Sequence, residues 1–146
     1  MSKDIDIAKE RLLTSDYTCV LCKGDIVYTS TLKGIAPVLG WLDEGKDMEG
    51  FAAADRIVGK AAGMLFVLAK VKEVYAPIMS ESAVELLRKH GITCSCEETV
   101  KKIINRMGTD ICPMEKTVQD IDDPKIALET LKQTVKRLRA QSSAQQ

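Results

Sequence analysis

The sequence is poor in aromatic residues, and its charges cancel. Two Phe, three Tyr and one Trp among 146 residues leave little material for the stacking surfaces that bind single strands or RNA. Lys plus Arg and Asp plus Glu both total 21, so the formal net charge is zero. A general nucleic-acid binder needs surplus cations to displace counterions, so we expect no nucleic-acid partner, although a local basic patch is compatible with this balance.

Long hydrophobic runs are also missing. The first ten residues, MSKDIDIAKE, are charged and lack the apolar stretch of a signal peptide. Within residues 50–70 the longest uncharged run, Ala61 to Ala69, is too short to span a bilayer. We therefore expect a cytoplasmic protein with no membrane contact. Its five cysteines, an odd number, fit reduced thiols better than a disulfide framework.

A single histidine and the cysteine spacing restrict metal and nucleophile chemistry. His90 lies at the predicted end of a helix, where it has a capping role and is poorly placed for a Ser-His or Cys-His system. Cys19 and Cys22 would face opposite sides of a strand. Cys94 and Cys96 share a face, but the combined spacing is not that of a zinc finger. We predict no metal site and no cofactor.

Periodicity and turn residues predict alternating helices and strands. Residues 52–70, AAADRIVGKAAGMLFVLAK, are apolar nearly all round and predict a long buried helix. The predicted elements are a helix over 3–14, a hairpin over 17–30 turning at Lys23-Gly24-Asp25, a short helix over 34–45, the helix over 52–70, a strand over 71–78, a helix over 80–91, a strand over 92–96, a helix over 97–104, and helices beginning at Pro113 and Pro124.

The order of these elements predicts an α/β fold. The strand, helix and strand between 71 and 96 require a parallel pair with a right-handed crossover, and the hairpin adds an antiparallel pair. We expect a three-layer α/β/α sandwich with a mixed sheet. Residues 1–125 would form a single domain, 124–140 a helix packed on it, and 141–146 a frayed tail. The stripe of Leu128, Leu131, Val135 and Leu138 packs either on the domain or on a second copy in a homodimer.

Three stretches carry a family resemblance: ADRIVGKAA, VKEVYAPIMSESAVELLRKHGI and NRMGTDICPMEKTVQDIDDP. Over residues 15–125 the chain resembles a small uncharacterised prokaryotic family, a domain of unknown function, assigned to the cytidine-deaminase-like fold. The resemblance implies a deaminase-like scaffold. A zinc deaminase places His or Cys before x-Glu at one helix start and P-C-x-x-C at the next. This chain has Ala53-Ala54-Asp55 and Pro77-Ile78-Met79-Ser80-Glu81 there, so it is not expected to be a zinc-dependent deaminase.

A charged cluster interrupts the apolar segment and suggests an anion site. Asp55, Arg56 and Lys60 would lie on the helix that lines the deaminase pocket, with the two cations one turn apart. An anionic ligand would relieve their repulsion; carboxylates of the protein itself, or solvent, are the alternative. Ser80 and Glu81 begin a helix after a parallel strand, where α/β sheets place ligands, although capping by Ser80 explains the same residues.

A second candidate group lies near Cys112. Asn105, Arg106 and Thr109 offer an amide, a guanidinium and a hydroxyl that suit an anionic ligand, although a turn followed by a helix cap is the alternative. Cys112 is the predicted cap of the next helix, where amides favour a thiolate. Glu115 competes for those amides and would raise the pKa of the thiol.

These residues lead to three hypotheses. The first is a metal-free protein that binds a nucleotide-like or other small anionic metabolite. The second is an enzyme that uses Cys112 as a nucleophile or redox thiol, and the third is a structural or assembly protein.

Overall fold

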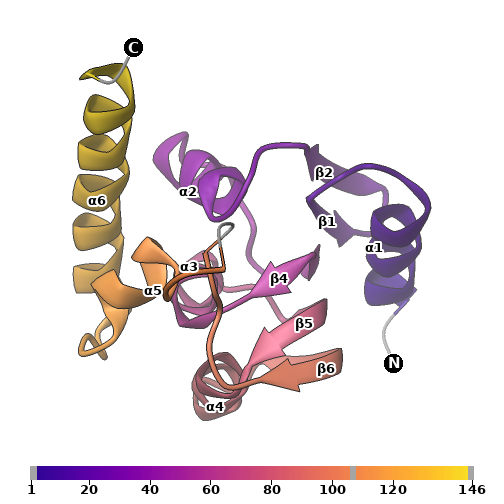
Figure 1. Ribbon diagram of the computed structural model, residues 1–146. Helices are drawn as coiled ribbons and strands as arrows, with labels where there is room; N and C mark the ends of the chain where they lie inside the picture. The colour runs from indigo at the N-terminus through magenta and orange to yellow at the C-terminus, as the bar shows by residue number, and fades with distance from the viewer. Residues whose placement is uncertain (1–2, 106–107, 145–146) are drawn as a thin grey trace.

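The computed structural model describes residues 3–105 and 108–144 (Figure 1). These residues form six helices and six strands. In chain order they are α1 (Lys3–Thr14), β1 (Cys19–Lys23), β2 (Ile26–Ser30), α2 (Ala36–Asp43), β3 (Ala52–Asp55), β4 (Ile57–Val58), α3 (Lys60–Ala69), β5 (Glu73–Ser80), α4 (Glu81–Lys89), β6 (Thr93–Val100), α5 (Pro113–Val118) and α6 (Pro124–Ala144).

The six strands form one sheet, and the prediction that this sheet is mixed is confirmed. Strand β1 pairs antiparallel with β2 and with β3, and the parallel part consists of β3, β4, β5 and β6. Strands β3 and β4 lie along the same edge of β5, because β6 occupies the other edge over the same residues. Only Arg56 separates β3 from β4. The order across the sheet is therefore β2, β1, β3 with β4, β5 and β6.

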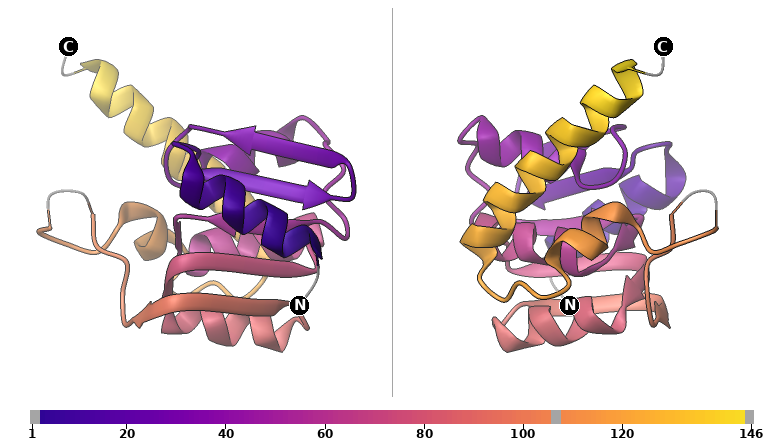
Figure 2. Two further views of the ribbon diagram at one scale, coloured as in Figure 1. Left: turned by 90° about the vertical axis from the view of Figure 1, so that its right-hand side faces the viewer. Right: turned by 60° about the vertical axis from the view of Figure 1, so that its left-hand side comes forward.

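Helices lie against both faces of the sheet (Figure 2). On one face, Ile5, Ala8 and Leu12 of α1 are buried against side chains such as Val20 and Ala54. On the other face, the core includes residues of α2, α3 and α4, and α6 packs on α3 and α5. The 3–14 helix, the hairpin and its turn are confirmed, and Gly24 has the positive φ of +60° that this turn requires.

The prediction of one helix over 52–70 is wrong in its first half. Ala52–Asp55 is a central strand paired with β1 and β5, Ile57–Val58 is a short strand paired with β5, and the helix begins only at Lys60. A strand buried on both faces has no alternation of polar and apolar residues, so its sequence looks like that of a buried helix. Asp55 and Arg56 are therefore not helical, and the repulsion expected between Arg56 and Lys60 on one helix does not arise.

Two predictions further along the chain also need correction. The helix expected over 97–104 is instead the second half of β6, which continues to Val100, followed by a bridge between Ile104 and Ile111. The carboxyl-terminal helix runs to Ala144, beyond the expected end at 140. The first difference arises because pairing with β5 along Thr93–Val100 outweighs the local helix propensity.

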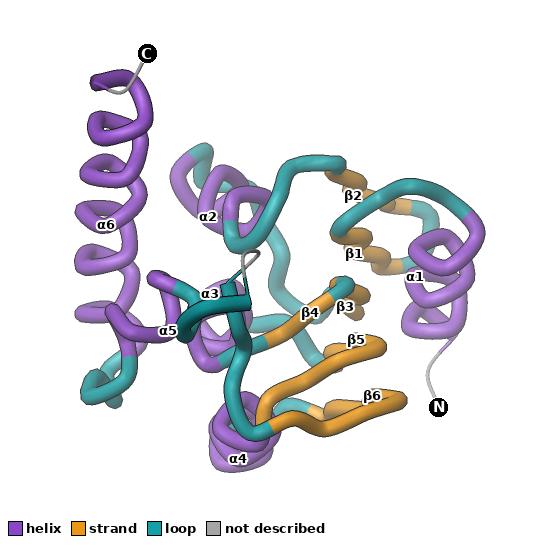
Figure 3. Tube along the Cα trace, viewed as in Figure 1, coloured by secondary structure: helices purple, strands orange, loops and turns teal. Residues whose placement is uncertain are grey.

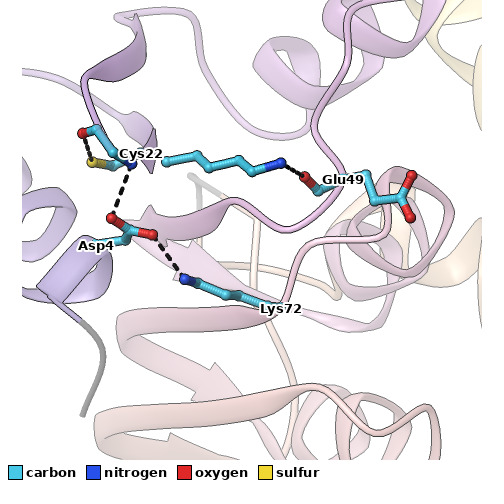
Figure 4. A network of polar contacts seen from close by, with 6 residues as sticks. Asp4, Cys22, Glu49 and Lys72 are labelled. Carbon is cyan, nitrogen blue, oxygen red and sulfur yellow. Dashed lines mark hydrogen bonds and ion pairs between the residues drawn. The ribbon is translucent and has the colours of Figure 1, made fainter.

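A polar network anchors α1 near the amino end of β5 (Figure 4). Asp4 accepts hydrogen bonds from Gly24 N at 3.1 Å and from Lys72 Nζ at 2.7 Å, and these contacts hold its pKa below the ordinary value. Lys23 Nζ donates to the carbonyl oxygen of Glu49 at 3.1 Å. The network therefore ties α1 to the β1–β2 turn and to the residue before β5.

Candidate functional site

The parallel strands β4, β5 and β6 end on the side of the sheet where α3 and α4 begin (Figure 3). Chain segments that leave the carboxyl ends of neighbouring parallel strands form the usual ligand crevice of α/β sheets. Here they border a recess of about 230 Å³, which we call the lysine pocket. Its lining residues are Lys60, Ser82, Lys101, Lys102, Ile103, Ile111, Glu115 and Gln119.

Glu115 crosses from α5 to the start of α3. Its two carboxylate oxygens accept hydrogen bonds from the backbone amides of Lys60 and Ala61, each at 2.8 Å. The residue at the helix start, Gly59, has no side chain with which to cap these amides. We expected Glu115 to compete for the amides of its own helix, but it satisfies those of α3. An internal carboxylate thus already occupies this helix terminus.

Lys60 is held on one wall of the pocket. Its ammonium group donates to the carbonyl oxygen of Gln119 at 3.2 Å and lies 3.8 Å from a carboxylate oxygen of Asp122. Its side chain is only 17% exposed. The cation is therefore fixed in position and only weakly compensated by an acid that is itself 91% exposed.

Lys101 and Lys102 bring two further cations to the pocket from the segment after β6. Both are exposed, and neither forms an ion pair with any residue that the structure describes. Among the described residues of the lining, Glu115 is the only carboxylate, and it already accepts two amide hydrogen bonds. The pocket therefore has an excess of positive charge.

The start of α4 contributes hydroxyl groups. Ser80 is buried and caps the helix as predicted, with its Oγ accepting from Ala83 N at 3.1 Å. Its Oγ also lies 3.1 Å from the Oγ of Ser82, which lines the pocket. Glu81, which we predicted as a ligand residue together with Ser80, is exposed and is not part of the lining. Ser82 is therefore the hydroxyl that a ligand would meet.

Arg56 is engaged away from the pocket. Its guanidinium donates to the carbonyl oxygens of Tyr17 at 2.9 Å, Leu12 at 2.6 Å and Ser15 at 2.7 Å. These carbonyls belong to the end of α1 and the loop that follows it, so Arg56 secures α1 to the sheet. Sequence analysis left open whether Arg56 binds a ligand or pairs within the protein. The structure shows that Arg56 pairs within the protein, although its partners are carbonyl oxygens rather than carboxylates.

Asp55 is buried at the end of β3 and also lies outside the lining. Burial raises the pKa of its carboxyl from 3.8 to about 7, although hydrogen bonds from the amides of Arg56 and Ile57 act in the opposite direction. Asp55 stands opposite Cys19 in the β1–β3 register. Burial and this neighbouring carboxylate raise the pKa of the Cys19 thiol.

The group predicted around Cys112 is only partly assembled. Asn105 and Thr109 bond to each other: Thr109 N donates to Asn105 Oδ1 at 3.1 Å, and Asn105 Nδ2 donates to Thr109 Oγ1 at 3.3 Å. Cys112 is the residue before α5, as expected, but it does not line the lysine pocket. Arg106 lies outside the described residues. Of the predicted ligand residues, Lys60 and Glu115 therefore line the pocket directly.

Sequence reasoning missed Lys101 and Lys102. The sequence feature that could have identified them is the pattern of Thr, Cys and Val in TCSCEETV, which is typical of a strand. We interpreted this segment as a short strand followed by a helix. Once Thr93–Val100 is one strand parallel to β5, the two lysines follow its carboxyl end. They then lie beside the start of α4.

The residues at the two helix starts do not fit a deaminase zinc ion. Gly59 and Lys60 begin α3, Ser80 and Glu81 begin α4, and neither position supplies the His or Cys that such a centre needs. Over residues 3–105 and 108–144, no three His, Cys, Asp or Glu side chains come together in a group that could hold a metal ion. The chemistry of the pocket is that of cations and hydroxyls.

These features define a mixed α/β protein with a cationic recess at the carboxyl edge of its parallel strands. The sequence profile of the family described as TM1506, domain of unknown function (DUF1893), matches residues 7–135, so the chain belongs to this family. The resemblance to an uncharacterised domain family is therefore confirmed.

A solved structure supports the same relationship. The chain is similar to the crystal structure of a DUF1893 family protein (TM1506) from Thermotoga maritima, with a TM-score of 0.83 and 25% sequence identity over 91% of each chain. A comparison with curated proteins found no match. In the described part of the chain, no helix combines the length and the apolar character needed to cross a membrane.

Proposed function

We propose that the protein binds a small anionic metabolite in the lysine pocket, on a cytidine-deaminase-like scaffold that works without zinc in the cytoplasm. The observation that carries the proposal is the convergence of Lys60, Lys101 and Lys102 beside Ser82 at the carboxyl ends of β4, β5 and β6. Support for the scaffold comes from the sheet order, in which an antiparallel hairpin precedes parallel strands linked by α3 and α4.

The charge of the pocket favours a phosphate or carboxylate group. Ammonium groups are good point-charge ligands for phosphate, and the hydroxyl of Ser82 adds a directional donor. Because Glu115 already holds the amides of Lys60 and Ala61, the ligand would bind beside α3 rather than on its helix terminus. Lys101, Lys102 and Ser82 would therefore make the principal contacts.

The volume of the pocket limits the ligand further. A recess of about 230 Å³ lies below the range of about 300–1,000 Å³ that is typical of drug-sized ligand sites. A small phosphorylated or carboxylated metabolite fits within it. A nucleotide would place its phosphate group there and leave its base outside, so we expect bases to contribute little to affinity.

The experiment is a thermal-shift and calorimetric titration with inorganic phosphate, a sugar monophosphate and adenosine monophosphate. We expect at least one of these anions to raise the melting temperature of the wild-type protein and to bind with a measurable Kd. Replacing both Lys101 and Lys102 with Ala removes two charge-assisted contacts, so Kd should rise by about tenfold or more. Ser82→Ala should weaken binding by a smaller factor.

The matched control removes two lysines elsewhere. Lys89 and Lys125 are exposed, lie outside the pocket and, with the described residues, form no ion pair. The double variant Lys89→Ala with Lys125→Ala should bind like the wild type. The proposal is wrong if no anion binds, or if the two double variants lose affinity equally, because the second result would indicate a general charge effect.

A further inference from the structure

A second, larger recess lies between α2 and α6, apart from the lysine pocket. Its volume is about 660 Å³, within the range of about 300–1,000 Å³ of sites that enclose drug-sized molecules. It shares no lining residue with the lysine pocket. We call it the α2–α6 groove. A ligand bound there would therefore contact none of the residues that line the lysine pocket.

The floor of the groove is apolar. Leu39 of α2, Met114 of α5 and Val135 of α6 line it, half-buried and packed against the core. Leu32, in the loop before α2, also lines it and is 58% exposed. An apolar group inserted here would remove this surface from water.

Cations surround the floor. Lys33 borders the groove from the loop before α2, and Lys136 and Arg139 border it from one side of α6, three residues apart. With the residues that the structure describes, these three cations form no ion pair. The fourth cation, Lys132, is already paired with Asp43 at 3.1 Å. The groove thus combines an apolar floor with three uncompensated positive charges.

A second copy of the same surface does not match this pattern. Helix α6 carries five cations, Lys125, Lys132, Lys136, Arg137 and Arg139, against one acid, Glu129. Two copies of α6 meeting at the groove would bring like charges together, which is destabilising. The complementary occupant has the opposite sign and an apolar body.

We infer that the α2–α6 groove binds a free, single-chain amphiphilic anion, with its alkyl chain on Leu32, Leu39 and Val135 and its head group near Lys136 and Arg139. The shared chemistry is an alkyl chain ending in a carboxylate or a phosphate. A carboxylate or phosphate monoester head group is matched by the point charges of the lysine and arginine. Burial of the chain supplies the larger part of the affinity.

The test is calorimetric titration of the full chain with octanoate, decanoate and dodecanoate, and with decyl phosphate, below the concentrations at which they form micelles. Affinity should rise about fourfold for each added methylene until the groove is filled. Comparison of decanoate with decyl phosphate identifies the preferred head group. Decylammonium, which has the same chain and the opposite charge, should bind at least tenfold more weakly.

Matched variants separate groove binding from general charge and hydrophobic effects. Lys136→Ala with Arg139→Ala should weaken decanoate binding about three- to tenfold, because two exposed charges are lost. Lys125→Ala with Arg137→Ala removes the same charge from α6 outside the groove and should have no effect. Leu32→Ser should also weaken binding, whereas Leu13→Ser, at a residue 49% exposed on α1, should not.

Several results would overturn the inference. These are no binding of any of the four anions, equal binding of decylammonium and decanoate, or equal losses in the groove variants and their controls. A wild-type protein that is dimeric by light scattering and becomes monomeric with Leu32→Ser would identify a second copy as the occupant. Because Lys101 and Lys102 lie outside the groove, their Ala variants should bind decanoate normally whether or not the lysine pocket binds its anion.

Discussion

Glu115 occupies the space that a side chain at Gly59 would enter. A Cβ built on Gly59 overlaps the Glu115 carboxylate, which is hydrogen-bonded to the amides of Lys60 and Ala61. Residue 59 is therefore restricted by close approach rather than by backbone conformation, since its φ of −102° suits any residue. The glycine and the glutamate act together as one cap of α3.

This relationship predicts strong coupling between the two positions. Glu115→Ala should destabilise the protein by about 1–2 kcal/mol, because two amides at the start of α3 lose their acceptor. Gly59→Ala should cost a similar amount by displacing the carboxylate. In the double variant the second change should cost little, because the cap is already lost. Urea denaturation of the four proteins measures this coupling; additive losses would show that the residues act separately.

Arg56 should matter for stability and not for anion binding. Its three hydrogen bonds to carbonyl oxygens of Leu12, Ser15 and Tyr17 hold the end of α1. Arg56→Ala should lower the free energy of unfolding by about 2–3 kcal/mol, as expected when several charge-assisted hydrogen bonds are lost. Arg56→Lys should recover only part of this loss, because an ammonium group cannot reproduce the planar geometry.

The matched control for Arg56 is Arg137→Ala, at an exposed residue of α6. It should change the free energy of unfolding by less than about 0.5 kcal/mol. Phosphate titrations of folded Arg56→Ala should give the wild-type Kd. A large rise in Kd at unchanged stability would instead place Arg56 in the binding site.

The parts of the fold that the sequence predicts are those where periodicity and turn chemistry agree. Ile5, Ala8 and Leu12 recur at helical spacing, and α1 has the predicted bounds. The helix prediction fails over residues 52–58 because alanine is a strong helix former. Here Ala52, Ala53 and Ala54 instead fill a central strand that is covered on both faces. Only the neighbouring strands decide between the two structures, and they are distant in sequence.

The candidate site was harder to predict than the fold. Lys60 and Glu115 were identified as individual residues, but their contact joins positions 55 residues apart. Nothing in the local sequence indicates which helix terminus a carboxylate will cap. Predicting Lys101 and Lys102 as site residues required the correct structure of residues 97–100. There, charged residues on the exposed edge strand β6 obscured the strand pattern.

Asp4 should stabilise the protein above its own pKa. The hydrogen bond from Lys72 and that from the amide of Gly24 lower its pKa in the folded state below the ordinary 3.8. Its contribution is therefore fully present above about pH 4–5 and is lost as the pH falls through the folded-state pKa. Asp4→Asn should cost about 0.5–1 kcal/mol at pH 7, since the pair is partly solvated, and almost nothing near pH 2.

Differential denaturation of Asp4→Asn and wild type at pH 2 to 7 measures this dependence. Asp6→Asn is the control, because Asp6 lies on the same turn and is exposed. Its difference from the wild type should be small at every pH. If Asp4→Asn instead lowers the free energy of unfolding by the same amount at every pH, the charge of Asp4 does not determine the effect.

Asp55 should have the opposite dependence on pH. Burial raises its pKa from 3.8 to about 7, so between these values the folded state binds a proton that the unfolded state releases. The free energy of unfolding contributed by Asp55 therefore falls as the pH rises, by about 1.4 kcal/mol per unit between pH 4 and 7. Asp55→Asn keeps an oxygen that accepts from the amides of Arg56 and Ile57 but cannot ionise. Relative to the wild type, its stability should rise through this range and level off above pH 7; parallel denaturation curves from pH 4 to 8 would show that the buried carboxyl does not titrate there.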